Sequence, residues 1–231
     1  MAFAEGIRQE WYFNKEVNNM TLRNSTKQQT DASNFYAGIL NEINDRIEIL
    51  NMAINGGMNL TAPFIREISY LQLRMMCELV AIGCLVAHGD IDDTKSHNLQ
   101  KEFNAEKIIN RLEHLHPNFY PHPVRLTKNG NTTKMERIES GFLTKSELIN
   151  LYRDCGEKLH RGRLKSFKEK SDKMMQPNFS DILEWGRKFI VLLEQHQISS
   201  LDNLSHFICT LKYQDTNNRA CVAIALSPIP L

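Results

Sequence analysis

The chain has 231 residues, with 28 Lys and Arg against 27 Asp and Glu, which leaves a formal net charge of +1. This balance excludes a histone-like basic protein and an acidic disordered chain, so any nucleic-acid site must come from local clustering of charge. Seven Pro and 11 Gly exclude collagen-like and low-complexity chains. A chain of this length is expected to form one domain with its own core.

The cysteines and the N-terminus indicate a reducing compartment. The chain has five Cys, an odd number without a CxxC pair, which is typical of free thiols. Glu5 and Arg8 interrupt the segment where a signal peptide would be continuously apolar. The longest nearly apolar run, 75–86, contains Glu78 and is too short to span a membrane. We therefore expect a cytoplasmic protein that does not enter a membrane.

The first part of the chain is polar. Residues 1–30 show no sustained periodicity, which predicts a loosely ordered N-terminal arm. From residue 31 apolar side chains recur every three or four positions, which predicts a helix with Asp31 or Ser33 as its cap and Gly56 and Gly57 after its end. We expect residues 31–231 to form a single domain.

A second helix is predicted from Thr61 to His88, with Pro63 in its first turn and Gly89 after its end. It is apolar on nearly every side, so we expect it to be the central helix of a bundle. Its polar exceptions share one stripe at 100° per residue. We interpret this stripe as a structural network that contains an i,i+4 ion pair. Its members are Glu67, Arg74 and Glu78.

The second half of the chain mixes two kinds of element. Helical patterns cover 99–115, 144–161 and 179–196, and Thr144 with Glu147 forms a capping box at the start of the second of these. Two turn signals between alternating segments predict β-hairpins near 122–139 and 205–227. The sequence thus predicts a mainly α fold, a bundle of about five helices with one or two peripheral antiparallel hairpins (α+β).

The helix predicted over 144–161 carries the candidate site. Arg153 and His160 are seven residues apart, so they share one face of the helix, away from the apolar face. Ile149 and Gly156 lie beside them on that face. A glycine in such a stripe lets another surface approach closely, which is typical of a packing seam. We expect Ile149 and Gly156 to line the interface of a symmetric homodimer.

The pattern of Arg153, the polar Asp154 and then His160 after six intervening residues resembles the motif of the HEPN superfamily (higher eukaryotes and prokaryotes nucleotide-binding). The resemblance implies a helical bundle over roughly residues 31–200. In active members it implies a metal-independent ribonuclease, often a dimer in which the two motifs face each other. Many members lack activity and serve as binding modules.

The chemistry of the motif suits RNA cleavage by the 2′-hydroxyl, which requires a base, an acid and positive charge at the phosphate. Arg153 can form a fork with phosphate oxygens, and His160 can exchange a proton near neutral pH. Asp154 and Glu157 would support them. The opposing interpretation is structural: Arg153 forms a salt bridge with Glu157 or Glu78, and His160 caps the helix.

A basic segment follows the motif. From Lys158 to Lys173 there are seven Lys or Arg against Glu169 and Asp172, a local charge of +5. Such a cluster can hold an RNA backbone without reading its sequence, and it is also typical of a solvated linker. The expected RNA-binding residues are Lys158, Arg161, Arg163, Lys165, Lys168 and Lys170.

Two other clusters carry less chemistry. His114, His116 and His122 lie close in sequence, but no Cys pair or acidic residue is placed to complete a zinc site, so we expect no metal and no cofactor. Cys155 and His160 point about 140° apart on an ideal helix, so Cys155 is interpreted as a buried thiol and not as a nucleophile.

Three functions remain open at this stage. The first is a HEPN-like RNA-binding protein, a metal-independent endoribonuclease where Arg153 and His160 act across a dimer. The alternative is a non-catalytic HEPN-like module for protein–protein interaction or nucleotide sensing. A third possibility is a sensor that binds a small molecule or a nucleotide between the helices and the hairpins.

Overall fold

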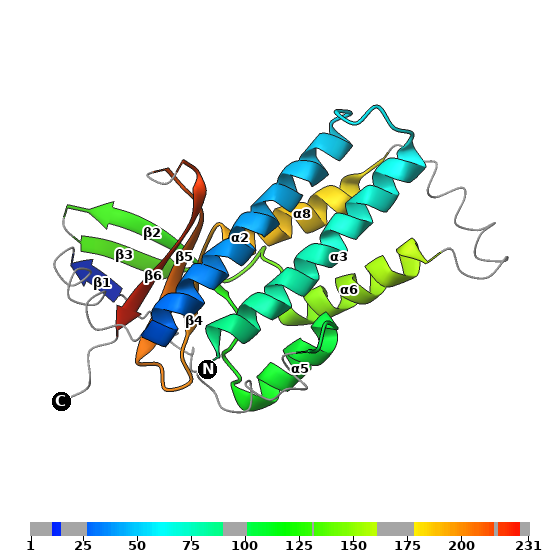
Figure 1. Ribbon diagram of the computed structural model, residues 1–231. Helices are drawn as coiled ribbons and strands as arrows, with labels where there is room; N and C mark the ends of the chain where they lie inside the picture. The colour runs from blue at the N-terminus through cyan, green and yellow to red at the C-terminus, as the bar shows by residue number, and fades with distance from the viewer. Residues whose placement is uncertain are drawn as a thin grey trace, which may run out of the picture.

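The computed structural model describes residues 11–14, 27–89, 101–130, 132–160, 178–214 and 217–226. Within these ranges five helices stand beside one antiparallel sheet, so the fold is α+β (Figure 1). The helices and the sheet share one hydrophobic core, which extends from Tyr36 and Leu73 to Phe207 and Ile224.

Two long helices, α2 (Lys27–Ile54) and α3 (Ala62–Ala87), pack side by side. Their close approach requires Gly83, because a Cβ atom there would lie 2.7 Å from the Tyr36 ring. Helix α2 ends where the sequence predicts, before Gly56, whose φ of +80° suits glycine. It begins before both expected caps, and the Ser33 hydroxyl instead donates to the Thr30 carbonyl, 2.8 Å away.

The predicted central helix is confirmed, since α3 contacts α2 and all three shorter helices. By length and composition the whole helix is apolar enough to cross a membrane, although the nearly apolar run 75–86 within it is too short to do so. However, 56% of its apolar window is buried inside the fold. This is the pattern of the core helix of a soluble protein, whose apolar surface is covered by other helices.

Two of the three shorter helices begin at a capping side chain. The side chain of Asn104 accepts the Lys107 N–H at the start of α5 (Ala105–Leu115). The predicted capping box is present at the start of α6 (Lys145–Leu159), where Thr144 and Glu147 bond reciprocally. Helix α8 (Ser180–Leu193) packs against α3, β2, β4 and β5.

The sheet has the strand order β1-β3-β2-β4-β5-β6, and every neighbouring pair is antiparallel. Both predicted hairpins are confirmed, as β2 with β3 and β5 with β6. They are not separate peripheral hairpins, because β4 pairs with both β2 and β5 and joins them into one sheet. In chain order the strand bounds are β1 Trp11–Asn14, β2 His122–Asn129, β3 Thr132–Arg137, β4 Gln195–Ser199, β5 Ser205–Tyr213 and β6 Arg219–Leu226.

Three segments differ from the sequence prediction. The helix predicted over 99–115 begins only at Ala105, since residues 101–104 are not helical. The predicted helix over 179–196 ends at Leu193, and strand β4 begins one residue after the Glu194 cap. Its last four residues are all buried, so it shows no strand-like alternation that would reveal it. Within the loosely ordered arm predicted over 1–30, residues 11–14 form β1 and pair with β3, and α2 begins at Lys27.

Candidate functional site

Helix α6 has one buried face and one exposed face, as its periodicity predicts. Leu148, Leu151 and Cys155 are buried against α3, whereas Arg153 and Asp154 are exposed. Burial raises the pKa of the Cys155 thiol to about 12, so this cysteine is an inert core residue, as expected. The candidate catalytic residues are therefore not part of the core.

Arg153 forms a two-pronged ion pair with Glu106 in the first turn of α5. Its Nε donates to Oε2 at 2.9 Å, and its Nη2 donates to Oε1. The hydrogen bond from Arg153 lowers the pKa of the Glu106 carboxyl group. The same bond and the charge of Glu106 raise the pKa of the Arg153 guanidinium. The sequence predicts Glu157 or Glu78 as the structural partner of Arg153, and the structure corrects this to Glu106.

His160 lies just beyond the end of α6 with an exposed side chain. It is the C-cap residue, and its backbone N–H donates to the Gly156 carbonyl at 3.0 Å. Its φ of −77° and ψ of 123° are extended, so seven-residue helical spacing no longer determines its direction relative to Arg153. Glu157 is also exposed on the last turn.

Gly156 and Ile149 do not form the free seam that the sequence predicts. A Cβ atom on Gly156 would lie 2.8 Å from Nη1 of Arg74, so the glycine makes room for an arginine of the same chain. Ile149 is half-buried and packs against the core. The stripe on α6 is therefore explained by packing within one chain.

The polar stripe of α3 meets α6. Arg74 Nε lies 3.3 Å from Glu78 Oε1, which confirms the predicted i,i+4 pair. Its Nη2 also donates to the Tyr152 hydroxyl at 2.7 Å, and its guanidinium lies 4.1 Å from the centre of the Tyr152 ring. Glu67, the third predicted member, is half-buried on the same helix.

A second polar cluster joins three helices and was not predicted. We call it the Tyr70 clasp: Arg66 and Tyr70 of α3, Lys158 of α6 and Asp181 of α8. The Tyr70 hydroxyl donates to Asp181 Oδ2 at 2.5 Å and accepts from Lys158 Nζ at 2.9 Å. Arg66 Nη1 lies 3.3 Å from both oxygens of the same carboxylate, and its Nη2 donates to the Asn178 carbonyl.

The clasp has a consistent electrostatic effect. Burial and the bond to Asp181 raise the pKa of Tyr70. Burial alone would raise the pKa of Asp181, but the Tyr70 hydroxyl and the Arg66 guanidinium outweigh it and lower that pKa. Asp181 is therefore ionised and Tyr70 neutral near pH 7. The apolar-looking sequence around Tyr70 carries no local signal for this arrangement, because Asp181 lies 111 residues away.

Of the expected RNA-binding residues, only Lys158 lies within the described part of the chain, and it is held by Tyr70. The others lie outside the described residues: Arg161, Arg163, Lys165, Lys168 and Lys170. The clasp includes Lys158, the first residue of this basic segment, and contacts the chain again at Asn178, after the segment.

The three clustered histidines separate into different environments. His116 is buried and its Nε2 donates to the Ser199 carbonyl at 3.0 Å, while His114 is exposed. Burial lowers the pKa of His122 on β2. Among the described residues, no group of three or more His, Cys, Asp or Glu side chains is arranged to hold a metal ion.

Comparisons of the chain with protein-family models, with curated proteins and with solved structures find no match. The resemblance to the HEPN superfamily therefore still depends on Arg153, Asp154 and His160. The geometry offers an exposed Arg153 on α6 and an exposed His160 just after its end, and the basic segment continues from there in the sequence.

Proposed function

We propose that this cytoplasmic protein has a HEPN-like bundle and binds RNA along the exposed side of α6. The observation that carries the proposal is that Arg153 and His160, the two ends of the motif, both have exposed side chains. Two nearby polar and aromatic residues, Arg74 and Tyr152, have a structural role, because they bond to each other in the contact between α3 and α6.

The ion pair with Glu106 does not prevent Arg153 from binding phosphate. The Arg153 side chain is 56% exposed and that of Glu106 is 26% exposed. A surface pair of this kind typically contributes only about 0–1 kcal/mol. An RNA phosphate can accept the same two-pronged hydrogen bonds, so it can replace the carboxylate.

The fuller form of the proposal is metal-independent cleavage across a homodimer. One chain supplies one Arg153 and one His160, whereas the 2′-hydroxyl route needs both an acid and a base. A twofold-related copy would supply the second pair. In this scheme Arg153 stabilises the developing charge on the phosphate oxygens, and His160 moves the proton.

The two-pronged Arg153–Glu106 contact also favours the alternative, a non-catalytic HEPN-like interaction or nucleotide-sensing module. In that case the pair would fix α5 against α6, and Arg153 would not meet phosphate. The two proposals differ in what happens when the Glu106 carboxylate is removed.

The experiment measures binding and cleavage of a short single-stranded RNA of mixed sequence in low salt with EDTA. His160→Ala should reduce cleavage by about 10²–10⁴-fold and leave binding nearly unchanged. Arg153→Ala should weaken both. Glu106→Gln should strengthen binding, because Arg153 no longer has a competing carboxylate. Cleaved products should end in a 2′,3′-cyclic phosphate.

Helix α8 offers a matched control, because Arg187 forms a similar exposed two-pronged pair with Glu184. Arg187→Ala and Glu184→Gln should change neither binding nor cleavage, and His114→Ala is the control for His160→Ala. Neutralising Lys165, Lys168 and Lys170 should flatten the slope of log K against log salt by about 2 for single-stranded RNA. Wild type that neither binds nor cuts RNA would favour the interaction module.

A further inference from the structure

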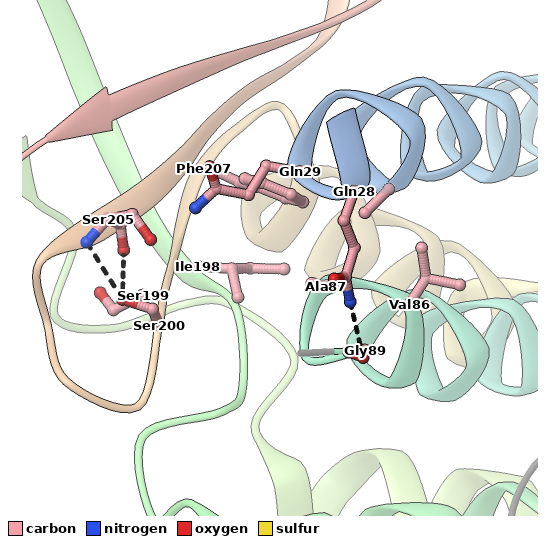
Figure 2. Close-up of a pocket in the computed structure, with 11 residues that line it drawn as sticks. Gln28, Gln29, Val86, Ala87, Gly89, Ile198, Ser199, Ser200, Ser205 and Phe207 are labelled. Carbon is pink, nitrogen blue, oxygen red and sulfur yellow. Dashed lines mark hydrogen bonds between the residues drawn. The ribbon is translucent and has the colours of Figure 1, made fainter. Parts of the chain in front are cut away.

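A pocket lies at the other end of α3, away from the candidate RNA surface. It is lined by the first turns of α2, the last turn of α3 and the hairpin that joins β4 to β5, and it opens to solvent (Figure 2). Its volume is about 280 Å³. The lining residues are Gln28, Gln29, Ala32, Val86, Ala87, Gly89, Ile198, Ser199, Ser200, Ser205 and Phe207.

The lining is apolar with an uncharged polar rim. Ala32, Val86, Ala87, Ile198 and Phe207 supply the apolar surface, while the polar groups are glutamine amides, serine hydroxyls and backbone. Not one of the lining residues that the structure describes has an ionisable side chain. A phosphate or carboxylate buried here would find no cation, which costs several kcal/mol.

The wall at Ser199 is fixed from behind. Nε2 of His116 lies 3.0 Å from the Ser199 carbonyl oxygen and donates to it, and Nε2 of His88 lies 3.2 Å from the same oxygen. The Ser199 hydroxyl lies 2.9 Å from His206 Nδ1 and accepts from Gln197 Nε2 at 3.0 Å. Because this strand end is held from three directions, the pocket does not need to reorganise on binding.

Each side of the pocket is also held by a hydrogen bond. Gln28 Nε2 reaches from α2 to the end of α3 and donates to the Gly89 carbonyl at 3.2 Å (Figure 2). On the opposite side the Ser200 hydroxyl accepts the Ser205 N–H at 3.0 Å and closes the hairpin. The pocket is therefore framed by hydrogen bonds between three different parts of the chain.

We infer that this pocket is a binding site for a small, uncharged and largely apolar molecule whose polar end meets the glutamine and serine rim. Its size suits such a ligand, because an apolar cavity of about 150 Å³ already holds benzene. The absence of charged side chains in the described lining favours uncharged ligands over phosphate ligands at this place. The inference stands independently of the proposed RNA site.

The test uses the full chain and two ¹⁹F probes of nearly equal size, 4-fluorobenzyl alcohol and 4-fluorobenzoate. The alcohol should bind in ¹⁹F NMR titrations, and the benzoate should bind at least about tenfold more weakly because its charge is unpaired. Ala32→Phe fills the pocket from α2 and should abolish binding of the alcohol. Ala37→Phe, the same change on a half-buried residue of α2 outside the lining, should leave it intact.

Gln28→Trp provides a second test that does not depend on core packing, since Gln28 is exposed at the rim. The indole should cover the opening and weaken binding of the alcohol in a folded protein, as judged by circular dichroism. Wild type that shows no binding of the alcohol, or equal binding in Ala32→Phe and Gln28→Trp, would overturn the inference. Equal affinity for the benzoate would overturn the claim that the site selects uncharged ligands.

Discussion

The two ends of α3 bury polar side chains by different means. In its N-terminal half Arg66, Tyr70 and Arg74 meet charged or phenolic partners, mostly from α6 and α8, and the side chain of Asp181 remains 43% exposed. At its C-terminal end His88 is completely buried, and its two ring nitrogens lie 2.8 Å from the Cys84 carbonyl and 3.2 Å from the Ser199 carbonyl.

The difference follows from the cost of removing charge from water. An ion pair that is fully buried loses more hydration than its attraction returns, so the charged end keeps contact with solvent. An imidazole can be buried as a neutral group when its one N–H donates to an acceptor and its other nitrogen accepts from a donor. His196 on β4 shows this, since its Nδ1 donates to the Leu193 carbonyl and its Nε2 accepts from the Tyr36 hydroxyl at 2.8 Å.

The largest effect is expected from the buried histidine end. His88→Ala should destabilise the protein by about 3 kcal/mol, because it opens a cavity and leaves a buried carbonyl without its donor. Urea unfolding at neutral pH measures this loss. The exposed His114 is the matched control, and His114→Ala should stay close to wild type. An equal loss in both variants would contradict the comparison.

Acidification should lower the free energy of unfolding mainly through the buried histidines. Burial lowers the pKa of His196 from 6.5 to about 4, so between these values the unfolded state binds the proton more strongly. Stability should therefore fall by about 2 kcal/mol from about pH 7 to about pH 5. His196→Asn keeps a donor for the Leu193 carbonyl and cannot titrate, so its stability should depend less on pH. Burial also lowers the pKa of His122 and His206, which preserves part of the slope.

Gly156 tests the packing at the charged end. Gly156→Leu should cost about 1–2 kcal/mol because its side chain collides with the Arg74 guanidinium. Gly156→Ala should be nearly neutral, since the gain of about 1 kcal/mol in helix propensity offsets a small shift of Arg74. Adding Arg74→Ala should recover part of the loss in Gly156→Leu. A loss of dimer in Gly156→Leu with unchanged stability would restore the seam that the sequence predicts.

The smallest effect is expected at the Tyr70 clasp. Tyr70→Phe should cost about 1 kcal/mol, less than for a fully buried charged hydrogen bond because Asp181 is partly exposed. NMR titration should show the pKa of Asp181 rising toward its ordinary value. A double-mutant cycle with Asp181→Asn isolates the pair, and a coupling energy of zero would show that the clasp does not contribute to stability.

Local signals explain which elements could be predicted. The capping box at Thr144 and Glu147 and the apolar period after it defined the start and the buried face of α6. The bounds of α3 and both hairpins were predicted for the same reason, because caps, turns and periodicity act over a few residues. Strand β4 was missed because it follows α8 after a single residue and is buried without alternation.

The candidate site shows where local reasoning ends. The sequence by itself determined that Arg153 lies on the exposed face of α6 and that Cys155 lies in the core, because helical period decides the face. Only the tertiary structure decided that Arg153 pairs with Glu106, 47 residues away, and that Gly156 makes room for Arg74. Ion-pair partners and close approaches depend on how helices pack against one another, and residue spacing within one helix carries no information about its neighbours.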